Sequence, residues 1–248
     1  MTNQVHVLDT GILTYEKSLL TLNYREFGKP VKIPILAYLI KTGKENILID
    51  TSFGPVDRPD LKTAGYERPL GHAQEPIAQL RNLGVGPDDV NIVVNTHLHD
   101  DHCGNNKLFP KAKFFVQKEE LRHAFVPDDN ERDANGPFCK RMDFDYPLDY
   151  RLMTGDYEIA DGVQVISTPG HTAGHQSVIV TLKDQNLIIT SDAVYMEENW
   201  NDPHVLPGLI YDSVAYMNSV KRMKSVKNSV VYVSHDMDFF KKMPREFS

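Results

Sequence analysis

The sequence is poor in the features that mark secreted and membrane-spanning proteins. It has only two cysteines, Cys103 and Cys139, which is too few for a disulfide framework and suits a reducing compartment. No apolar run approaches the roughly 18 residues that a membrane-spanning helix needs. The first residues show neither a basic segment nor a long apolar stretch, so we expect no signal peptide. These absences predict a cytoplasmic protein with no membrane partner.

The chain also lacks an excess of basic residues. It has 27 Lys and Arg against 34 Asp and Glu, a formal net charge of -7. Nucleic-acid binders depend on Lys and Arg to neutralise phosphates, so we expect no nucleic-acid partner. Hydrophobic residues make up 41% of the 248 residues, which is enough for a sizeable core. The oligomeric state is left open, with a homodimer as one alternative.

The order of strand and helix signals predicts the fold. No repeat, low-complexity tract or Gly/Ser linker divides the chain, so we expect a single domain over residues 1–248. Strands are predicted at residues 5–8, 35–40, 46–49, 92–94, 114–116, 163–167, 177–182, 186–190 and 230–233. Helices are predicted at 75–83, at 119–124 and from Asp212 to about 226, the last with Val214, Met217 and Val220 on one face. The alternation indicates an α/β fold of two packed mixed sheets with helices outside.

One segment breaks this pattern. From about residue 126 to 150 the composition shifts to Asp, Asn, Pro and aromatic residues without a clear period. Loops of this length are often functional. We therefore expect a lid loop at about residues 124–150.

The strongest chemical signal is the run Thr96-His97-Leu98-His99-Asp100-Asp101-His102, directly after a predicted buried strand. Imidazoles and carboxylates are good ligands for zinc and similar divalent metals. A turn that leaves a strand and enters a helix can aim alternate side chains at two centres. The competing interpretation is a solvated polar loop.

Three further residues share the position of this run. His171, Asp192 and His235 each follow the end of a predicted strand. Side chains from different strands can meet at one edge of a sheet. A buried core histidine and a turn-forming aspartate are the ordinary alternatives, but they do not account for the same placement at four strand ends. The sequence therefore predicts a joint metal site.

These residues resemble the metallo-β-lactamase superfamily, through the pattern His97-x-His99-x-Asp101-His102 followed by His171, Asp192 and His235. The resemblance implies an αββα sandwich, which is α/β or, in some schemes, α+β. It also implies that His97, His99 and His171 hold one metal and that Asp101, His102 and His235 hold the other. Asp192 would bridge both metals.

Within that superfamily the chain is most similar to N-acyl homoserine lactone lactonases, the quorum-quenching enzymes. The similar segments are Gly155-Asp156-Tyr157-Glu158, Thr168-Pro169-Gly170-His171-Thr172-Ala173-Gly174-His175-Gln176-Ser177 and Asp192-Ala193-Val194-Tyr195. The resemblance implies that Tyr195 is catalytic. The chain departs from the pattern at Asp100, where these lactonases usually carry a large apolar or aromatic residue beside the metals, and in the lid loop.

A hydrolytic mechanism follows as a hypothesis. Two divalent cations, zinc by first expectation and manganese, iron or cobalt as alternatives, would hold a bridging hydroxide that attacks the lactone carbonyl. Tyr195 would help to polarise the carbonyl, and Asp101 would pass a proton to the leaving alkoxide. Asp50 would orient a ligand imidazole, with a turn role as the alternative, and Cys103 would only pack. No residue is assigned to any other cofactor.

Three alternative functions are compatible with the same metal ligands. The first is hydrolysis of another lactone, such as pyridoxolactone, with the same two metals. The others are a glyoxalase II-like thioesterase and a non-catalytic metal-binding protein. An acyl chain would need an apolar groove, for which residues 12–27 and 196–210 and the lid phenylalanines Phe125, Phe138 and Phe144 are candidates. His175 is a candidate for a supporting role beside the ligands.

Overall fold

The computed structural model describes residues 2–22, 26–55, 57–128, 132–133, 136–201 and 205–248. Within them, one sheet has seven strands in the order β14-β1-β2-β3-β4-β5-β8. Their bounds are β1 Gln4–Glu16, β2 Pro30–Lys41, β3 Asn46–Ile49, β4 Ile92–Val94, β5 Lys113–Gln117, β8 Asp149–Met153 and β14 Glu246–Phe247. The strands β3, β4, β5 and β8 run parallel, whereas β14, β1, β2 and β3 pair antiparallel.

The second sheet has five strands in the order β13-β12-β11-β10-β9. Their bounds are β9 Tyr157–Ala160, β10 Val163–Ser167, β11 Gln176–Thr181, β12 Asn186–Ser191 and β13 Ser229–Val233. Only β12 and β13 are parallel neighbours. A separate two-stranded ladder joins β6 Arg132–Asp133 to β7 Gly136–Pro137.

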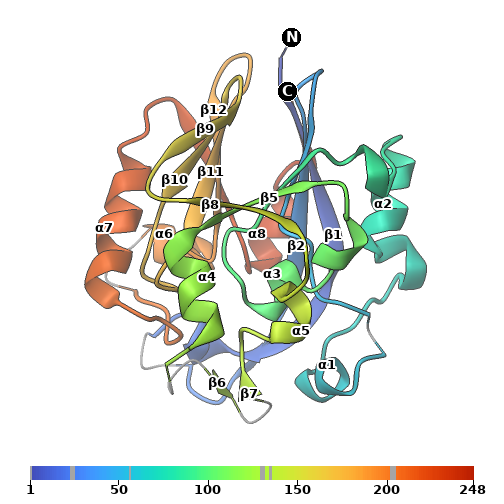
Figure 1. Ribbon diagram of the computed structural model, residues 1–248. Helices are drawn as coiled ribbons and strands as arrows, with labels where there is room; N and C mark the ends of the chain where they lie inside the picture. The colour runs from blue at the N-terminus through green and yellow to red at the C-terminus, as the bar shows by residue number, and fades with distance from the viewer. Residues whose placement is uncertain (1, 23–25, 56, 129–131, 134–135, 202–204) are drawn as a thin grey trace.

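Helices cover the outer faces of the two sheets. The α-helices are α1 Pro59–Ala64, α2 Pro76–Asn82, α3 Asp100–Cys103, α4 Lys118–Phe125, α5 Arg141–Phe144, α6 Glu197–Asn201, α7 Ser213–Lys224 and α8 Met237–Lys242. Short 3-10 helices lie at η1 Lys17–Leu19, η2 Gly71–Gln74, η3 Pro87–Asp89 and η4 Asn106–Leu108. Figure 1 shows α2 outside the first sheet and α7 outside the second, so the layers follow the order αββα. No helix in the described ranges is long and apolar enough to span a membrane.

The two-residue period of the strands explains this layering. In β2, Tyr38 and Ile40 belong to the core between the two sheets, whereas Ala37 and Leu39 belong to a second core with Leu80 of α2. Alternate side chains of a strand point to opposite faces. An apolar strand such as β2 is therefore buried on both sides, which requires a sheet on one face and a helix on the other.

The αββα sandwich confirms the predicted fold class, and every strand predicted from the sequence is present. The hairpin of β2 and β3, the helix α2 with Gly84 beyond its end, and the capping of α7 by Asp212 are confirmed as well. The Asp212 carboxylate accepts hydrogen bonds from the N–H groups of Val214 and Ala215. The structure adds short elements that lack a readable period, including α1, α8 and β9.

Two predictions need correction. The predicted face of α7 is right for Val220 but wrong for Val214, which is 61% exposed, and the helix buries Tyr216, Ser219, Val220 and Met223. A Cβ atom at Gly170 would lie 2.3 Å from the Tyr216 backbone nitrogen, so a close approach to the Gly170 loop sets the rotation of the helix. The second correction is that residues 126–150 are not a continuous loop. They contain β6, β7, α5 and the start of β8, while residues 129–131 and 134–135 lie outside the described residues.

Candidate metal centre

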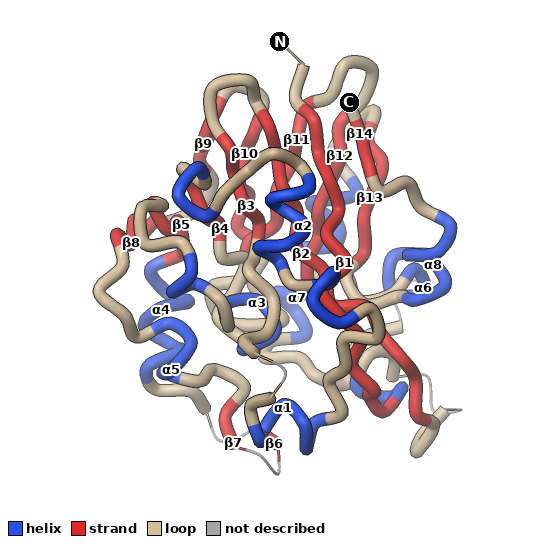
Figure 2. The backbone as a smooth tube through the Cα atoms, turned by 90° about the vertical axis from the view of Figure 1, so that its right-hand side faces the viewer, coloured by secondary structure: helices blue, strands red, loops and turns tan. Residues whose placement is uncertain are grey.

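The four predicted strand ends converge at one end of the sandwich, where Figure 2 shows α1, α3 and α5 gathered below the strands. His97 follows β4, His171 follows β10, Asp192 follows β12 and His235 follows β13. The motif leaves β4 as an extended turn, and α3 begins directly after His99, as the sequence predicts. The structure thus brings together all seven side chains that the sequence nominates, which we call the metal floor: His97, His99, Asp101, His102, His171, Asp192 and His235.

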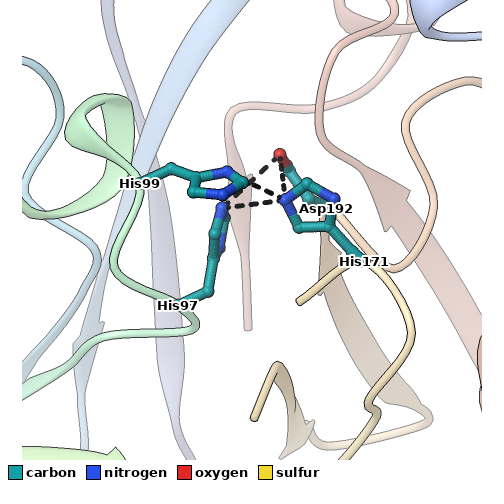
Figure 3. Close-up of side chains that lie close together, drawn as sticks. All are labelled: His97, His99, His171 and Asp192. Atoms are coloured by element: carbon teal, nitrogen blue, oxygen red, sulfur yellow. Dashed lines mark hydrogen bonds and ion pairs between the residues drawn. The ribbon is translucent and has the colours of Figure 1, made fainter. Parts of the chain in front are cut away.

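The first group of the metal floor contains three imidazoles and one carboxylate. His171 Nε2 lies 3.1 Å from His97 Nε2 and 3.1 Å from His99 Nδ1. The Asp192 Oδ2 atom lies 3.5 Å from His171 Nε2 and 3.7 Å from His97 Nε2. Figure 3 shows these four side chains pointing toward a common centre.

The second group contains two imidazoles and two carboxylates, and it shares Asp192 with the first. The Asp192 Oδ1 atom lies 3.1 Å from His235 Nε2 and 3.4 Å from His102 Nε2. Asp101 Oδ2 lies 3.3 Å from His102 Nε2 and 3.6 Å from His235 Nε2. One carboxylate therefore presents one oxygen to each group, which is the arrangement of a bridging ligand.

The two groups differ in their electrostatics. Burial, with additional repulsion between the rings, holds the pKa of His97 and of His171 well below the ordinary value, and burial lowers that of His99 to about 4. In the second group burial opposes protonation, but Asp101, Asp192 and Asp50 raise the pKa of His102 well above the ordinary value. The first group offers neutral imidazoles, and the second attracts positive charge.

The donor set fits divalent cations. Among the described residues, His102 Nε2 and Asp192 Oδ1 are buried without a hydrogen-bond partner, although both face the second group. Buried polar atoms without partners are costly, and a cation between them would satisfy both. Neutral imidazole nitrogens and carboxylate oxygens are the ligands that zinc and related metals take. Metal binding by these residues is therefore chemically reasonable, and their individual roles as ligands stay predictions.

Asp50 orients His102, as predicted, and also occupies a turn. Its Oδ2 atom accepts a hydrogen bond from His102 Nδ1 at 2.8 Å, and the carboxylate also accepts from the N–H and the hydroxyl of Thr96. Both of the alternatives for this residue hold, because its φ of 58° places it in the left-handed region at the end of β3. A metal-bound histidine commonly donates its other N–H in this way.

Glu120 of α4 is a buried carboxylate that the sequence analysis missed. Its Oε1 atom accepts a hydrogen bond from the Leu98 N–H at 2.9 Å, and its Oε2 atom accepts from the Thr172 hydroxyl at 2.6 Å and from the Gly174 N–H at 3.1 Å. Leu98 lies between His97 and His99, and Thr172 follows His171. Glu120 therefore ties together the two loops of the first group. In the sequence it resembles any solvated glutamate of a charged helix.

Three further residues discussed in the sequence, Tyr195, His175 and Cys103, lie outside the metal floor. The Tyr195 hydroxyl lies 2.9 Å from His171 Nδ1, so this residue is adjacent to the first group. His175 is fully buried beside the ligand rings and pairs with Thr168, outside both groups. Cys103 packs in an apolar cluster with Leu98 and Phe144, which agrees with the predicted packing role.

A pocket with largely apolar walls opens above the metal floor. We call its lining outside the metal floor and Tyr195 the pocket wall: Leu13, Tyr15, Leu20, Ile33, Phe53, Asp100, Phe138, Lys140 and Leu209. The predicted groove segments supply Leu13, Tyr15, Leu20, Phe138 and Leu209. The prediction is wrong for Phe125 and Phe144, which pack in the cluster around Cys103 instead. Residues 23–25 and 202–204 of those segments lie outside the described residues.

Asp100 takes part in an ion-pair network at this wall. Its Oδ2 atom lies 2.7 Å from Lys140 Nζ, which also contacts Asp60 at 2.9 Å. Asp60 pairs with Arg58 at 2.7 Å, and Arg58 pairs with Asp143 at 2.6 Å. Burial raises the pKa of Asp100 to about 7, although Lys140 acts in the opposite direction.

The comparison with known proteins agrees with this geometry. The sequence model of one protein family, described as the metallo-beta-lactamase superfamily, matches residues 32–235. N-acyl homoserine lactonase AttM of Azorhizobium caulinodans is 32% identical, in an alignment that covers 97% of each chain. The chain belongs to the metallo-beta-lactamase superfamily and to its N-acyl homoserine lactonase family.

Other members of this superfamily are similar over most of their length. N-acyl homoserine lactonase AiiA of Bacillus thuringiensis subsp. kurstaki is 30% identical over 222 aligned residues, which cover 85% of this chain and 84% of the relative. A solved structure of an N-acyl homoserine lactone hydrolase, with the product N-hexanoyl-L-homoserine at its catalytic metal centre, superposes with a TM-score of 0.85. That match has 25% sequence identity and covers 98% of this chain and 97% of the other.

Proposed function

We propose that this protein is a dinuclear metal-dependent lactonase that opens the ring of N-acyl homoserine lactones. The observation that carries the proposal is that two His/Asp groups share Asp192 at the floor of a pocket with apolar walls. A neutral ring ester with an acyl chain matches the metal floor and the pocket wall. The metal floor suits hydrolysis of the ester, and the pocket wall suits an alkyl chain. The similarity to N-acyl homoserine lactonases supports the same substrate class.

The metal ligands are assigned by group. His97, His99 and His171 would hold one cation, Asp101, His102 and His235 the other, and Asp192 both. We propose zinc in both positions, since His and Asp suit zinc, and manganese, iron and cobalt accept the same ligands. When bound, the two cations supply a water of lowered pKa and positive charge beside the lactone carbonyl.

Tyr195 would donate a hydrogen bond to the lactone carbonyl oxygen. Burial, reinforced by Asp192, raises the pKa of its phenol well above the ordinary value, so the hydroxyl keeps its proton. His171 Nε2 faces the first group, and its Nδ1–H can therefore donate to the Tyr195 oxygen at 2.9 Å. A hydroxyl that accepts one hydrogen bond still has its own O–H to donate. That proton would stabilise the negative charge that develops on the carbonyl oxygen.

Asp101 would deliver the proton that completes ring opening. Hydrolysis adds a water oxygen to the carbonyl carbon, breaks the bond from that carbon to the ring oxygen, and leaves an alkoxide that must be protonated. Asp101 lines the pocket and is the most exposed carboxylate of the metal floor, with 14% of its side chain accessible. A positioned carboxyl group of this kind can take up a water proton and pass it to the leaving oxygen.

Four wider expectations belong to the same proposal. The enzyme would act in the cytoplasm on a small molecule, which fits two buried cysteines that form no disulfide. Residues 1–248 would form one domain, supported by a core that both sheets share. The segment at about 124–150 would act as a lid, since Phe138 and Lys140 line the pocket. A homodimer would be detected by light scattering of the purified protein.

The decisive experiment measures acid release from N-acyl homoserine lactones, pyridoxolactone, S-lactoylglutathione and a bis-phosphodiester. Each is tested with the purified protein, after removal of metal by a chelator, and after reloading with zinc, manganese, iron or cobalt. We expect metal-dependent opening of the acyl homoserine lactones with kcat/KM above about 10⁴ M⁻¹s⁻¹. A fully loaded protein that prefers another member of the panel would contradict the proposed substrate, and inactivity on all of them would contradict the enzymatic function.

A further inference from the structure

One part of the pocket wall is charged, although its neighbours are mostly apolar. Asp100 and Lys140 both line the pocket, and their ion pair is largely buried, with 12% and 18% of the two side chains exposed. The other wall residues are apolar or aromatic. Burying two charges is expensive unless they are paired. A charged pair at this position therefore needs an explanation that an alkyl chain alone does not provide.

The ammonium group of Lys140 retains a donor. Among the described residues its Nζ atom contacts two carboxylates, Asp100 at 2.7 Å and Asp60 at 2.9 Å. An ammonium has three N–H donors and no acceptor. Asp60 is in turn held by Arg58 at 2.7 Å. The network fixes the position of Lys140 and leaves one N–H for a ligand in the pocket.

The partner of Lys140 adjoins the metal floor in the sequence. Asp100 stands between His99 and Asp101, two members of the metal floor. The Asp100 backbone N–H donates to the Phe138 carbonyl at 3.1 Å, and the Phe138 ring lies 5.4 Å from the His99 ring. The segment that carries Lys140 therefore packs directly against the start of α3. A donor here would meet the part of a substrate next to its amide rather than the far end of an acyl chain.

The charge of the network restricts the ligand. It contains three carboxylates, Asp60, Asp100 and Asp143, and two cations, Arg58 and Lys140. The formal sum is one negative charge, so the network has no excess positive charge with which to attract an anionic substrate. A neutral hydrogen-bond acceptor therefore fits this part of the pocket wall.

We propose that the Asp100–Lys140 pair selects N-acyl homoserine lactones that carry a carbonyl at the third carbon of the acyl chain. Lys140 Nζ donates to this 3-oxo oxygen, and Asp100 and Asp60 hold the ammonium in place. The rest of the acyl chain lies against the apolar residues of the pocket wall. This inference rests on the proposed function, because it names the substrate subclass of the same site.

The test compares two substrates that differ only in that carbonyl, 3-oxooctanoyl-homoserine lactone and octanoyl-homoserine lactone. The measured quantity is the ratio of their kcat/KM values in the metal-loaded wild type, in Lys140→Met and in the double variant Asp100→Leu/Lys140→Met. The double variant removes both charges together, and Asp60 keeps its pairing with Arg58. Lys111→Met is the matched control, because Lys111 pairs with Asp88 in an exposed ion pair outside the pocket.

We expect the wild type and Lys111→Met to prefer the 3-oxo substrate by about tenfold, the lower end for a hydrogen bond from a charged donor. In both variants of Lys140 the ratio should fall to about one, mainly through KM, with metal content unchanged. A purely structural pair would lower both kcat/KM values together and leave their ratio intact. If Lys140→Met does not fold, the double variant decides.

The outcomes separate this inference from the proposed function. A wild type that opens both lactones at equal kcat/KM, or a ratio that survives loss of Lys140, overturns the role of the Asp100–Lys140 pair and leaves the lactonase intact. A loaded wild type that opens neither lactone overturns the proposed function and the inference together.

Discussion

The metal floor and the pocket wall are built in different ways. Four members of the metal floor lie within six consecutive residues, and its other members follow three strand ends. The pocket wall takes its residues from β1, the residue after η1, β2, the segment after β3, the first residue of α3, the segment before α5 and residue 209, most of which are far apart in the sequence. The floor is also held from behind by Asp50 and Glu120. The difference suggests that reaction and substrate choice can be altered separately.

The largest effect is expected from Asp192→Ala, because this residue alone belongs to both groups of the metal floor. We expect loss of metal from both groups and a fall in kcat/KM of about 10⁴-fold, since the two proposed cations would supply most of the catalysis. Metal content by mass spectrometry and lactone hydrolysis are the two measurements. Asp184→Ala in the exposed turn before β12 is the control. Full metal content and activity in Asp192→Ala would contradict the assignment of the reaction to the metal floor rather than to the pocket wall.

Tyr195→Phe separates the reaction from metal binding. If Tyr195 acts as proposed, the variant lacks the hydrogen-bond donor to the developing oxyanion, so kcat should fall by about 10²-fold while two metals stay bound. Steady-state kinetics and metal analysis of the same sample test this. The control is Tyr216→Phe, since the buried Tyr216 hydroxyl has no hydrogen-bond partner in the described part of the chain. Unchanged turnover in Tyr195→Phe would remove the phenol from the mechanism.

Asp50→Asn tests the support behind the second group. An amide would place N–H donors against the donors of Thr96 and His102, so we expect metal affinity in this group to fall about 10- to 100-fold. Asparagine tolerates the left-handed φ of 58° at this position. Competition with a chelator measures the affinity of each metal. The first group should keep its cation, and equal weakening of both groups would argue against a local role.

Leu20→Ala should have the smallest effect, confined to the pocket wall. Leu20 is 1% exposed and lines the pocket. Truncation removes apolar contact with a long acyl chain, so KM for a decanoyl substrate should rise about tenfold while kcat and metal content stay unchanged. A butanoyl substrate serves as the internal reference. Val214→Ala, on the exposed side of α7, is the control variant. A loss of metal in Leu20→Ala would show that wall and floor are not separable.

Local patterns account for most of what could be predicted. β4 is a buried apolar run, and the His97–His102 motif follows it within a few residues, so neither depends on distant contacts to be recognised. The prediction for α7 was correct in extent, but of its predicted face Val220 is buried and Val214 is exposed. Helical periodicity locates a helix, whereas the approach of Gly170 to Tyr216 sets its rotation. The short α5 and the edge strand β8 have too few apolar positions to show a period.

The sequence by itself determined the fold class and nominated all seven residues of the metal floor, because these depend on strand periodicity and on ligand types at strand ends. Only the tertiary structure decided which oxygen of Asp192 faces which group, that Asp50 and Glu120 hold the ligand loops, and that Asp100 pairs with Lys140. Contacts between residues more than 20 positions apart leave no local pattern in composition or spacing. They arise when packing of the two sheets brings those segments together.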